Sequence, residues 1–180
     1  MLVLRCTHRL LYRLGPPVAD PPESTTVLGD WYAKPFSVGR KPFVLMISGT
    51  TRIAVVVPGR GSAHLIATFL SGLADLLARL AVPTQVIERE MAASQEVVLA
   101  ETDSRSLLGT LNDFATISGI RLAEKPDTAL VDLSVWLSRT PVAPLGYRYP
   151  ADAARELFGL APDSIAVSTS DSSSRSGRVL

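Results

Sequence analysis

The sequence predicts an α+β fold, in which an antiparallel or mixed sheet of about five or six strands carries two main amphipathic helices on one face. Two observations predict it. Residues 41–60 hold two short apolar runs on either side of a Ser-Gly-Thr-Thr-Arg turn, as in a buried β-hairpin. Residues 62–81 and 104–118 repeat apolar side chains at three- and four-residue spacing, which is typical of amphipathic helices.

The hairpin at residues 41–60 is the segment around which we expect the core to form. Its runs, residues 43–47 and 53–57, are too short for helices and rich in strand-forming side chains. Gly49 stands between them, where a tight turn requires a residue that tolerates positive φ. A charge at a central position of either run is therefore expected to unfold the domain.

The N-terminal part predicts a strand at residues 2–4 and a short helix at residues 8–14, followed by a loop with four prolines at residues 16–26. Trp31 follows in the segment LGDWYA. We interpret it as closing the open edge of the core, with a ligand platform as the alternative.

The second half predicts two more polar strands at residues 85–90 and 96–101, near a sheet edge. Residues 129–137 alternate apolar and polar side chains, which favours a strand, although a helix beginning at Asp127 fits the same residues. We expect residues 1–160 to form one domain and the serine-rich residues 161–180 to be disordered.

The composition restricts the partners and the cellular compartment that we expect. Eighteen basic and seventeen acidic side chains leave no overall field to attract nucleic acid or an anionic membrane. The single cysteine, Cys6, suits a reducing compartment, so we expect a cytoplasmic protein with no membrane segment. The arginine-rich N-terminus is interpreted as a strand and a helix, with an organelle transit peptide as the alternative.

Few sequence motifs indicate a catalytic, phosphate-binding or metal-binding site. No phosphate-binding GxxxxGK[ST] or nucleophile G-x-S-x-G is present, and Cys6, His8 and His64 are too few to predict a metal site. We therefore predict no metal and no cofactor. Arg60, Gly61 and Ser62 lie between a strand and a helix, where backbone N–H groups could bind an anion; a glycine turn with a helix-capping serine is the alternative.

The helix at residues 104–118 carries a polar stripe of Arg105, Gly109 and Asn112, with Asp113 beside it. A guanidinium, an amide and the gap left by a glycine could hold a carboxylate, a phosphate or a partner's backbone. Alternatively, the glycine admits a neighbouring element while the polar side chains bond to loop carbonyls.

Several segments together resemble an uncharacterised family of small bacterial proteins, classed as a domain of unknown function. They are RSLLGTLNDFA at residues 105–115, LGDWYA at residues 28–33, the opening LVLRCTHRLL and SRTP at residues 138–141. The resemblance extends to about residue 150. It implies a bacterial cytosolic protein without an established activity, and it indicates Trp31, Arg105, Gly109 and Asn112 as first site candidates.

The absence of a paired nucleophile and base favours a non-enzymatic binding or regulatory module, acting through a protein partner or a small anionic ligand. Its candidate surface is formed by Asp30, Trp31, Arg105, Gly109, Asn112 and Asp113. The alternative is an enzyme acting on a phosphorylated or nucleic-acid substrate. In that case Arg60 and Arg105 would bind phosphate, and Asp30 or Asp113 would act as acid or base.

Overall fold

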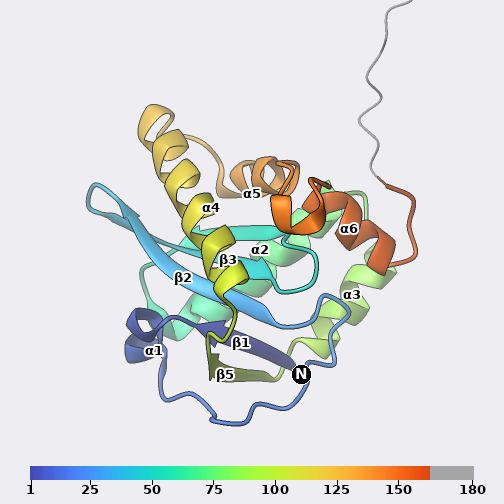
Figure 1. The fold of residues 1–180 in the computed structure, drawn as a ribbon, viewed down its shortest axis with the longest axis horizontal. Coiled ribbons are helices and arrows are strands. Elements are labelled where there is room, and N and C mark those ends of the chain that lie inside the picture. The colour runs from blue at the N-terminus through green and yellow to red at the C-terminus, as the bar shows by residue number, and fades with distance from the viewer. Residues whose placement is uncertain (163–180) are drawn as a thin grey trace, which may run out of the picture.

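The computed structural model describes residues 1–162, which form a five-stranded mixed sheet with helices on both faces (Figure 1). The strands are β1 (Leu2–Cys6), β2 (Trp31–Val38), β3 (Lys41–Ser48), β4 (Ala54–Pro58) and β5 (Val97–Glu101). They lie in the order β4-β3-β2-β1-β5, with β1 parallel to β2 and β5, and the other pairs antiparallel. The predicted α+β fold with a mixed sheet is confirmed.

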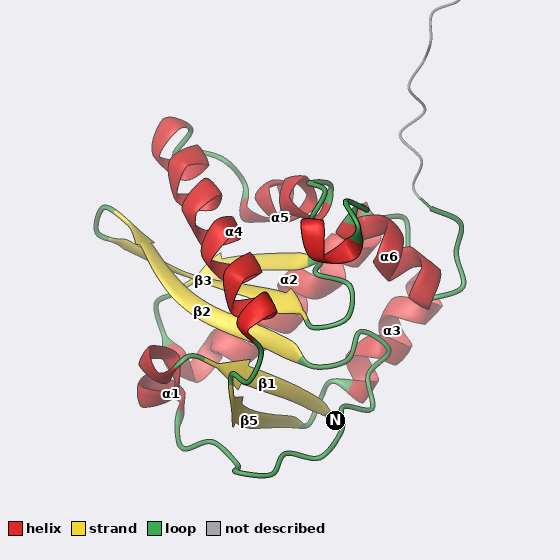
Figure 2. Cartoon of the chain, viewed as in Figure 1, coloured by secondary structure: helices red, strands yellow, loops and turns green. Residues whose placement is uncertain are grey.

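The helices cover the sheet from both sides (Figure 2). They are α1 (His8–Leu14), α2 (Leu65–Arg79), α3 (Thr84–Ala93), α4 (Arg105–Glu124), α5 (Leu130–Ser138) and α6 (Pro150–Leu157), with 3-10 turns at Ser62–His64 and Ala143–Leu145. One core lies between the sheet and α1, α2 and α6, and a second lies between the sheet and α4 and α5.

The two main helices therefore lie on opposite faces, and the prediction that they share one face was wrong. The reason is in β3, where Val44 and Met46 point into the first core while Leu45 and Ile47 point into the second. A strand that is apolar on both faces requires a layer of side chains on each. The helices supply these two layers.

The predicted hairpin forms β3 and β4, but β4 is an edge strand rather than a central one. Its outer N–H groups are paired by α5, because Ala54 donates to Ser138 Oγ at 3.1 Å and Val56 donates to Ser134 Oγ at 3.0 Å. Serines four residues apart on a helix are about 6 Å apart along its axis, close to the roughly 6.7 Å that separates alternate residues of a strand. Helix α5 thus seals this edge.

The interpretation of residues 129–137 as a strand was wrong, since they form α5 from Leu130 onward. The buried side of α5 includes Leu133, Ser134, Leu137 and Ser138, which follow helical spacing. Two of these buried positions are serines that bond to β4. The positions of the apolar residues therefore indicated only half of the buried face of the helix.

The strand predicted at residues 85–90 was also wrong, because α3 occupies this segment. Glu90 is buried there, and its carboxylate accepts the backbone N–H groups of Val27 and Leu28 at 2.9 and 3.1 Å. A carboxylate that satisfies two N–H groups can face inward. Because a glutamate is normally expected at the surface, Glu90 concealed the helical period of residues 84–93.

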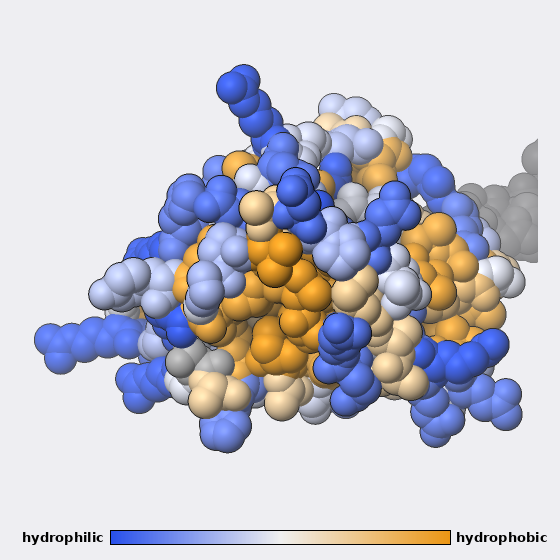
Figure 3. All heavy atoms as spheres, turned by 90° about the horizontal axis from the view of Figure 1, so that it is seen from below, coloured by the Kyte–Doolittle hydropathy of each residue, from blue (hydrophilic) through white to orange (hydrophobic). Residues whose placement is uncertain are grey.

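The opposite edge of the sheet, β5, is covered by a loop. In the proline-rich residues 16–22, which we call the strap, Val18 donates its N–H to the carbonyl of Leu99 at 2.8 Å. The underside of the molecule, where α1 and β5 lie, shows an apolar area ringed by hydrophilic residues (Figure 3). Val97 and Leu99 of β5 pack against the first core but are only partly buried.

Residues 163–180 lie outside the described part of the chain, and with them almost all of the serine-rich tail that was predicted to be disordered. Within residues 1–162, no helix has both the length and the apolar character needed to span a bilayer.

Candidate functional site

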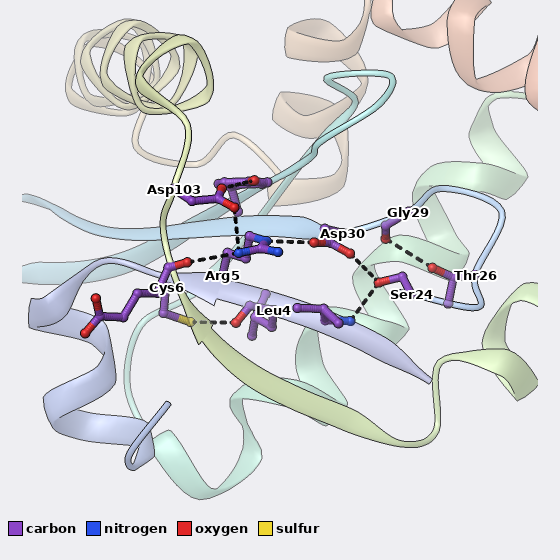
Figure 4. A network of polar contacts seen from close by, with 11 residues as sticks. Leu4, Arg5, Cys6, Ser24, Thr26, Gly29, Asp30 and Asp103 are labelled. Carbon is purple, nitrogen blue, oxygen red and sulfur yellow. Dashed lines mark hydrogen bonds and ion pairs between the residues drawn. The ribbon is translucent and has the colours of Figure 1, made fainter. Parts of the chain in front are cut away.

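A polar network surrounds Arg5 at the carboxyl end of β1 (Figure 4). Its guanidinium forms ion pairs with two carboxylates, from Nε to Asp30 Oδ2 at 2.7 Å and from an Nη to Asp103 Oδ2 at 2.8 Å. Ser24 donates to the other oxygen of Asp30 at 2.7 Å, and the Tyr32 hydroxyl donates to Asp103 Oδ1 at 2.5 Å. Charge-assisted bonds of this kind fix the positions of both carboxylates.

Burial and these partners shift the pKa values in the network. Burial acts to lower the pKa of Arg5, but the hydrogen bond to Asp30 and the neighbouring carboxylates outweigh it and leave the value raised. Burial, together with the hydrogen bond to Asp103, raises the pKa of Tyr32. Arg5 is therefore a permanent cation, and Tyr32 is a protonated donor at neutral pH.

The network lies where the chain leaves neighbouring parallel strands toward opposite faces. After β1 the chain enters α1, which packs in the first core, and after β5 it enters α4, which packs in the second. In parallel sheets, such a switch point opens a crevice outside the carboxyl ends of the strands, and ligands bind there. Helix α4 is capped at this point by Ser104, which accepts the N–H of Leu107 at 3.3 Å.

A crevice with a volume of about 640 Å³ is present at this position. Arg5 and Ala100 form its floor, the strap forms one wall, and residues 101–103 form the other. One guanidinium and three carboxylates line it: Arg5 against Asp20, Glu101 and Asp103. Because Arg5 is already paired with two carboxylates, the crevice presents a net negative charge to a ligand.

Cys6 is adjacent to the network and is a free, buried cysteine. Its side chain is buried, its Sγ donates to the carbonyl of Leu4 at 3.7 Å, and burial raises its pKa to about 12. The thiol is therefore protonated, and its role is in packing.

Of the residues predicted from sequence, the structure brings Asp30 into the network and places Trp31 in the core. Trp31 is fully buried, with its ring edge-on to Phe69 at a centroid distance of 4.9 Å. It faces away from the network, since its side chain belongs to the first core while Tyr32 belongs to the second.

Arg105, Gly109, Asn112 and Asp113 all lie exposed on α4, as the helical spacing predicts. Asn112 accepts a hydrogen bond from Lys34 on β2, so this part of the stripe borders the β2–β3 hairpin. A side chain added at Gly109 would meet nothing within 4 Å, so no neighbouring element fills its gap in the described structure.

Arg60, Gly61 and Ser62 precede α2 on the opposite side of the sheet from α4. The 3-10 turn Ser62–His64 stands before the first residue of α2, and His64, at the N-cap, makes no side-chain capping bond. The structure therefore does not bring Arg60 together with Arg105.

Sequence reasoning missed Arg5, Tyr32, Asp20, Glu101 and Asp103. The available signal was a charge inside or just after an apolar strand, as in LVLRC and VVLAETD. That signal becomes specific only when the two strands are known to be parallel neighbours. Their paired residues are 95 positions apart in the sequence (Leu2 with Val97), which conceals the pairing.

Among the described residues, no group of three or more His, Cys, Asp or Glu side chains is arranged to hold a metal ion. The family model described as "Domain of unknown function (DUF6933)" matches residues 3–153 of the chain. No curated protein and no solved structure matches it. The predicted resemblance to a domain of unknown function is thereby confirmed.

Proposed function

Since the chain belongs to the family described as a domain of unknown function, DUF6933, we propose its function from its own geometry. It is a binding module whose ligand site is the crevice at the carboxyl ends of β1 and β5. The observation that carries this proposal is the crevice lining, in which three carboxylates surround one guanidinium that is itself paired.

The ligand is a small molecule with an amine or a guanidinium group. Three carboxylates converging on a hollow attract a cation and provide acceptors for its N–H groups. An anion would have to approach Asp20 and Glu101, which have no cationic side chain at ion-pair distance in the described residues apart from His8, 3.9 Å from Glu101. The small anionic ligand expected from the sequence therefore finds no support at this site.

The alternative of an enzyme acting on a phosphorylated substrate is not favoured by any contact here. In that interpretation Arg60 and Arg105 bind phosphate of the substrate, and these residues lie on opposite sides of the sheet. Asp30, its candidate acid or base, is held by Arg5 and Ser24.

Isothermal titration calorimetry with agmatine, spermidine, glucose 6-phosphate and inorganic phosphate at constant ionic strength tests this function. We expect saturable binding of agmatine or spermidine and none of the two phosphates. Asp20→Asn is expected to weaken binding about tenfold because it removes a crevice carboxylate, whereas Asp113→Asn, an equal change on exposed α4, leaves it unaltered. Binding of the phosphates alone, or equal loss in both variants, would contradict the proposal.

A further inference from the structure

A second hollowed surface lies at the other end of α4, beside the β2–β3 hairpin. Two hollows of ≈ 650 and ≈ 360 Å³ adjoin there and share Ala123 in their linings. The last turns of α4 and the tip of the β2–β3 hairpin both project beyond the rest of the sheet (Figure 1). The residues that line the two hollows come mainly from these two segments. We call this surface the α4–hairpin groove.

The floor of the groove is apolar. Phe36 of β2 stacks on Phe43 of β3 with a centroid distance of 5.4 Å, and both rings are only partly buried. Ile120 on α4 lines the groove with 55% of its surface exposed. Apolar side chains left open at a concave surface favour contact with an apolar partner.

Small residues form one stripe of the α4 wall. Ala115, Gly119 and Ala123 follow one another at four-residue spacing and therefore lie on one stripe of the helix. A side chain built at Gly119 would have no atom within 4 Å. The stripe spans about 12 Å, or two turns, and leaves room for the side chains of a second helix to approach.

The charges at the groove have one sign. Lys34, Arg40 and Lys41 line the two hollows, and no carboxylate does so. Lys34 donates to Asn112, and none of the three cations has a carboxylate at ion-pair distance within the described residues. A basic rim beside an apolar floor selects a partner with acidic groups beside an apolar stripe.

We propose that the α4–hairpin groove docks an amphipathic helix of a protein partner, whose apolar stripe is flanked by Asp or Glu. The apolar side chains of that helix would contact Phe36 and Ile120 beside the small-residue wall. Its carboxylates would pair with Lys34, Arg40 and Lys41. This inference is independent of the crevice, which lies at the other end of α4 and carries the opposite charge.

A displayed library of helical peptides tests the proposal. Its apolar stripe is fixed, and its flanking positions are randomised among Asp, Glu, Ser, Lys and Arg. Selection on the folded protein is expected to enrich Asp and Glu at the flanks. A selected peptide should bind at least about tenfold more weakly to Gly119→Leu, which fills the groove, and to Lys34→Glu, which reverses its charge.

Gly109→Leu is the matched control, because Gly109 lies on the same helix, also has open space at its Cβ position, and is outside both hollows. It should leave peptide affinity unchanged. The proposal is overturned if no peptide is selected, if basic flanks are enriched, or if Gly109→Leu weakens binding as much as Gly119→Leu.

Two further results would assign the groove to a different occupant. Decanoate displacing every selected peptide while binding more tightly than any of them would indicate a site for a small apolar anion. A dimer seen by sedimentation velocity that Gly119→Leu dissociates would indicate a second copy of the chain. Either result overturns the assignment to a partner helix.

Discussion

The two edges of the sheet are completed in different ways. At the β4 edge, Ser134 and Ser138 of α5 accept the outward N–H groups of the strand, and both serines are buried. At the β5 edge, the strap contacts the strand through one backbone hydrogen bond among residues 1–162, from Val18 to Leu99, and a crevice opens at the carboxyl end of the strand.

The difference separates a structural edge from a binding edge. A helix that satisfies successive N–H groups closes an edge to other chains and to ligands. A loop that contacts the edge strand through one backbone hydrogen bond leaves polar and apolar surface of that strand accessible. We therefore expect substitutions at the β4 edge to change stability without changing ligand affinity, and substitutions around β5 to change both.

The largest effect is expected from replacing Ser134 and Ser138 together by Ala. Two buried N–H groups would lose their acceptors, at a cost of about 1–3 kcal/mol each. Urea denaturation should show this loss while agmatine affinity in the folded protein stays constant. Ser37→Ala, at an exposed position of β2, is the control. A loss within the control's error would show that α5 does not seal the edge.

Arg5→Met is expected to have the second largest effect, a loss of about 2 kcal/mol in the free energy of unfolding. It leaves Asp30 and Asp103 without their cation, but their side chains remain 24% and 56% exposed, so the cost is below that of a fully buried pair. Arg105→Met, in the exposed stripe of α4, should change stability by less than about 0.5 kcal/mol. Equal effects of the two substitutions would contradict the network's structural role.

Val18→Pro should cost about 1 kcal/mol, because it deletes the N–H that bonds to Leu99 and so detaches the strap. Since the strap forms a wall of the crevice, agmatine affinity should fall as well. Val18→Ala retains the N–H and is the control for the lost side chain. If calorimetry finds the same affinity in both variants, the strap is not part of the site.

The last prediction is a pH dependence that is absent at neutral pH. The folded protein raises the pKa of Tyr32 above its ordinary value of 10.0, so it holds the phenol proton more tightly than the unfolded chain. The free energy of unfolding should therefore decline as the pH rises above 10, by at most about 1.4 kcal/mol per pH unit. In Tyr32→Phe this part of the decline should disappear. Cys6, whose pKa is also raised, contributes equally in both proteins. Identical slopes would contradict the role of Tyr32.

The fold was predictable in segments where apolar side chains are buried and polar side chains are exposed. The apolar runs of β3 and β4 and the leucine periodicity of α2 predicted their structures, because each run has the period of its element. The prediction failed where buried polar groups had partners distant in sequence. Glu90 bonds to the backbone of residues 27 and 28, and the serines of α5 bond to β4.

The candidate site was less predictable because it depends on strand order. Asp30 was selected from the sequence together with its neighbour Trp31. Side chains alternate along the backbone there, so Asp30 joins the network while Trp31 points into the first core. Arg5 and Asp103 are brought together only by the parallel pairing of β1 with β5. No local pattern in a sequence records such a pairing.

The most direct test of the binding edge is a ¹H–¹⁵N NMR titration of the protein with agmatine. We expect saturable shifts for the amides of Arg5, of strap residues 18–20 and of residues 101–103, and unchanged amides for Ala54 and Val56 on the sealed edge. Shifts confined to the β4 edge or to the α4–hairpin groove would contradict it, as would shifts that do not saturate.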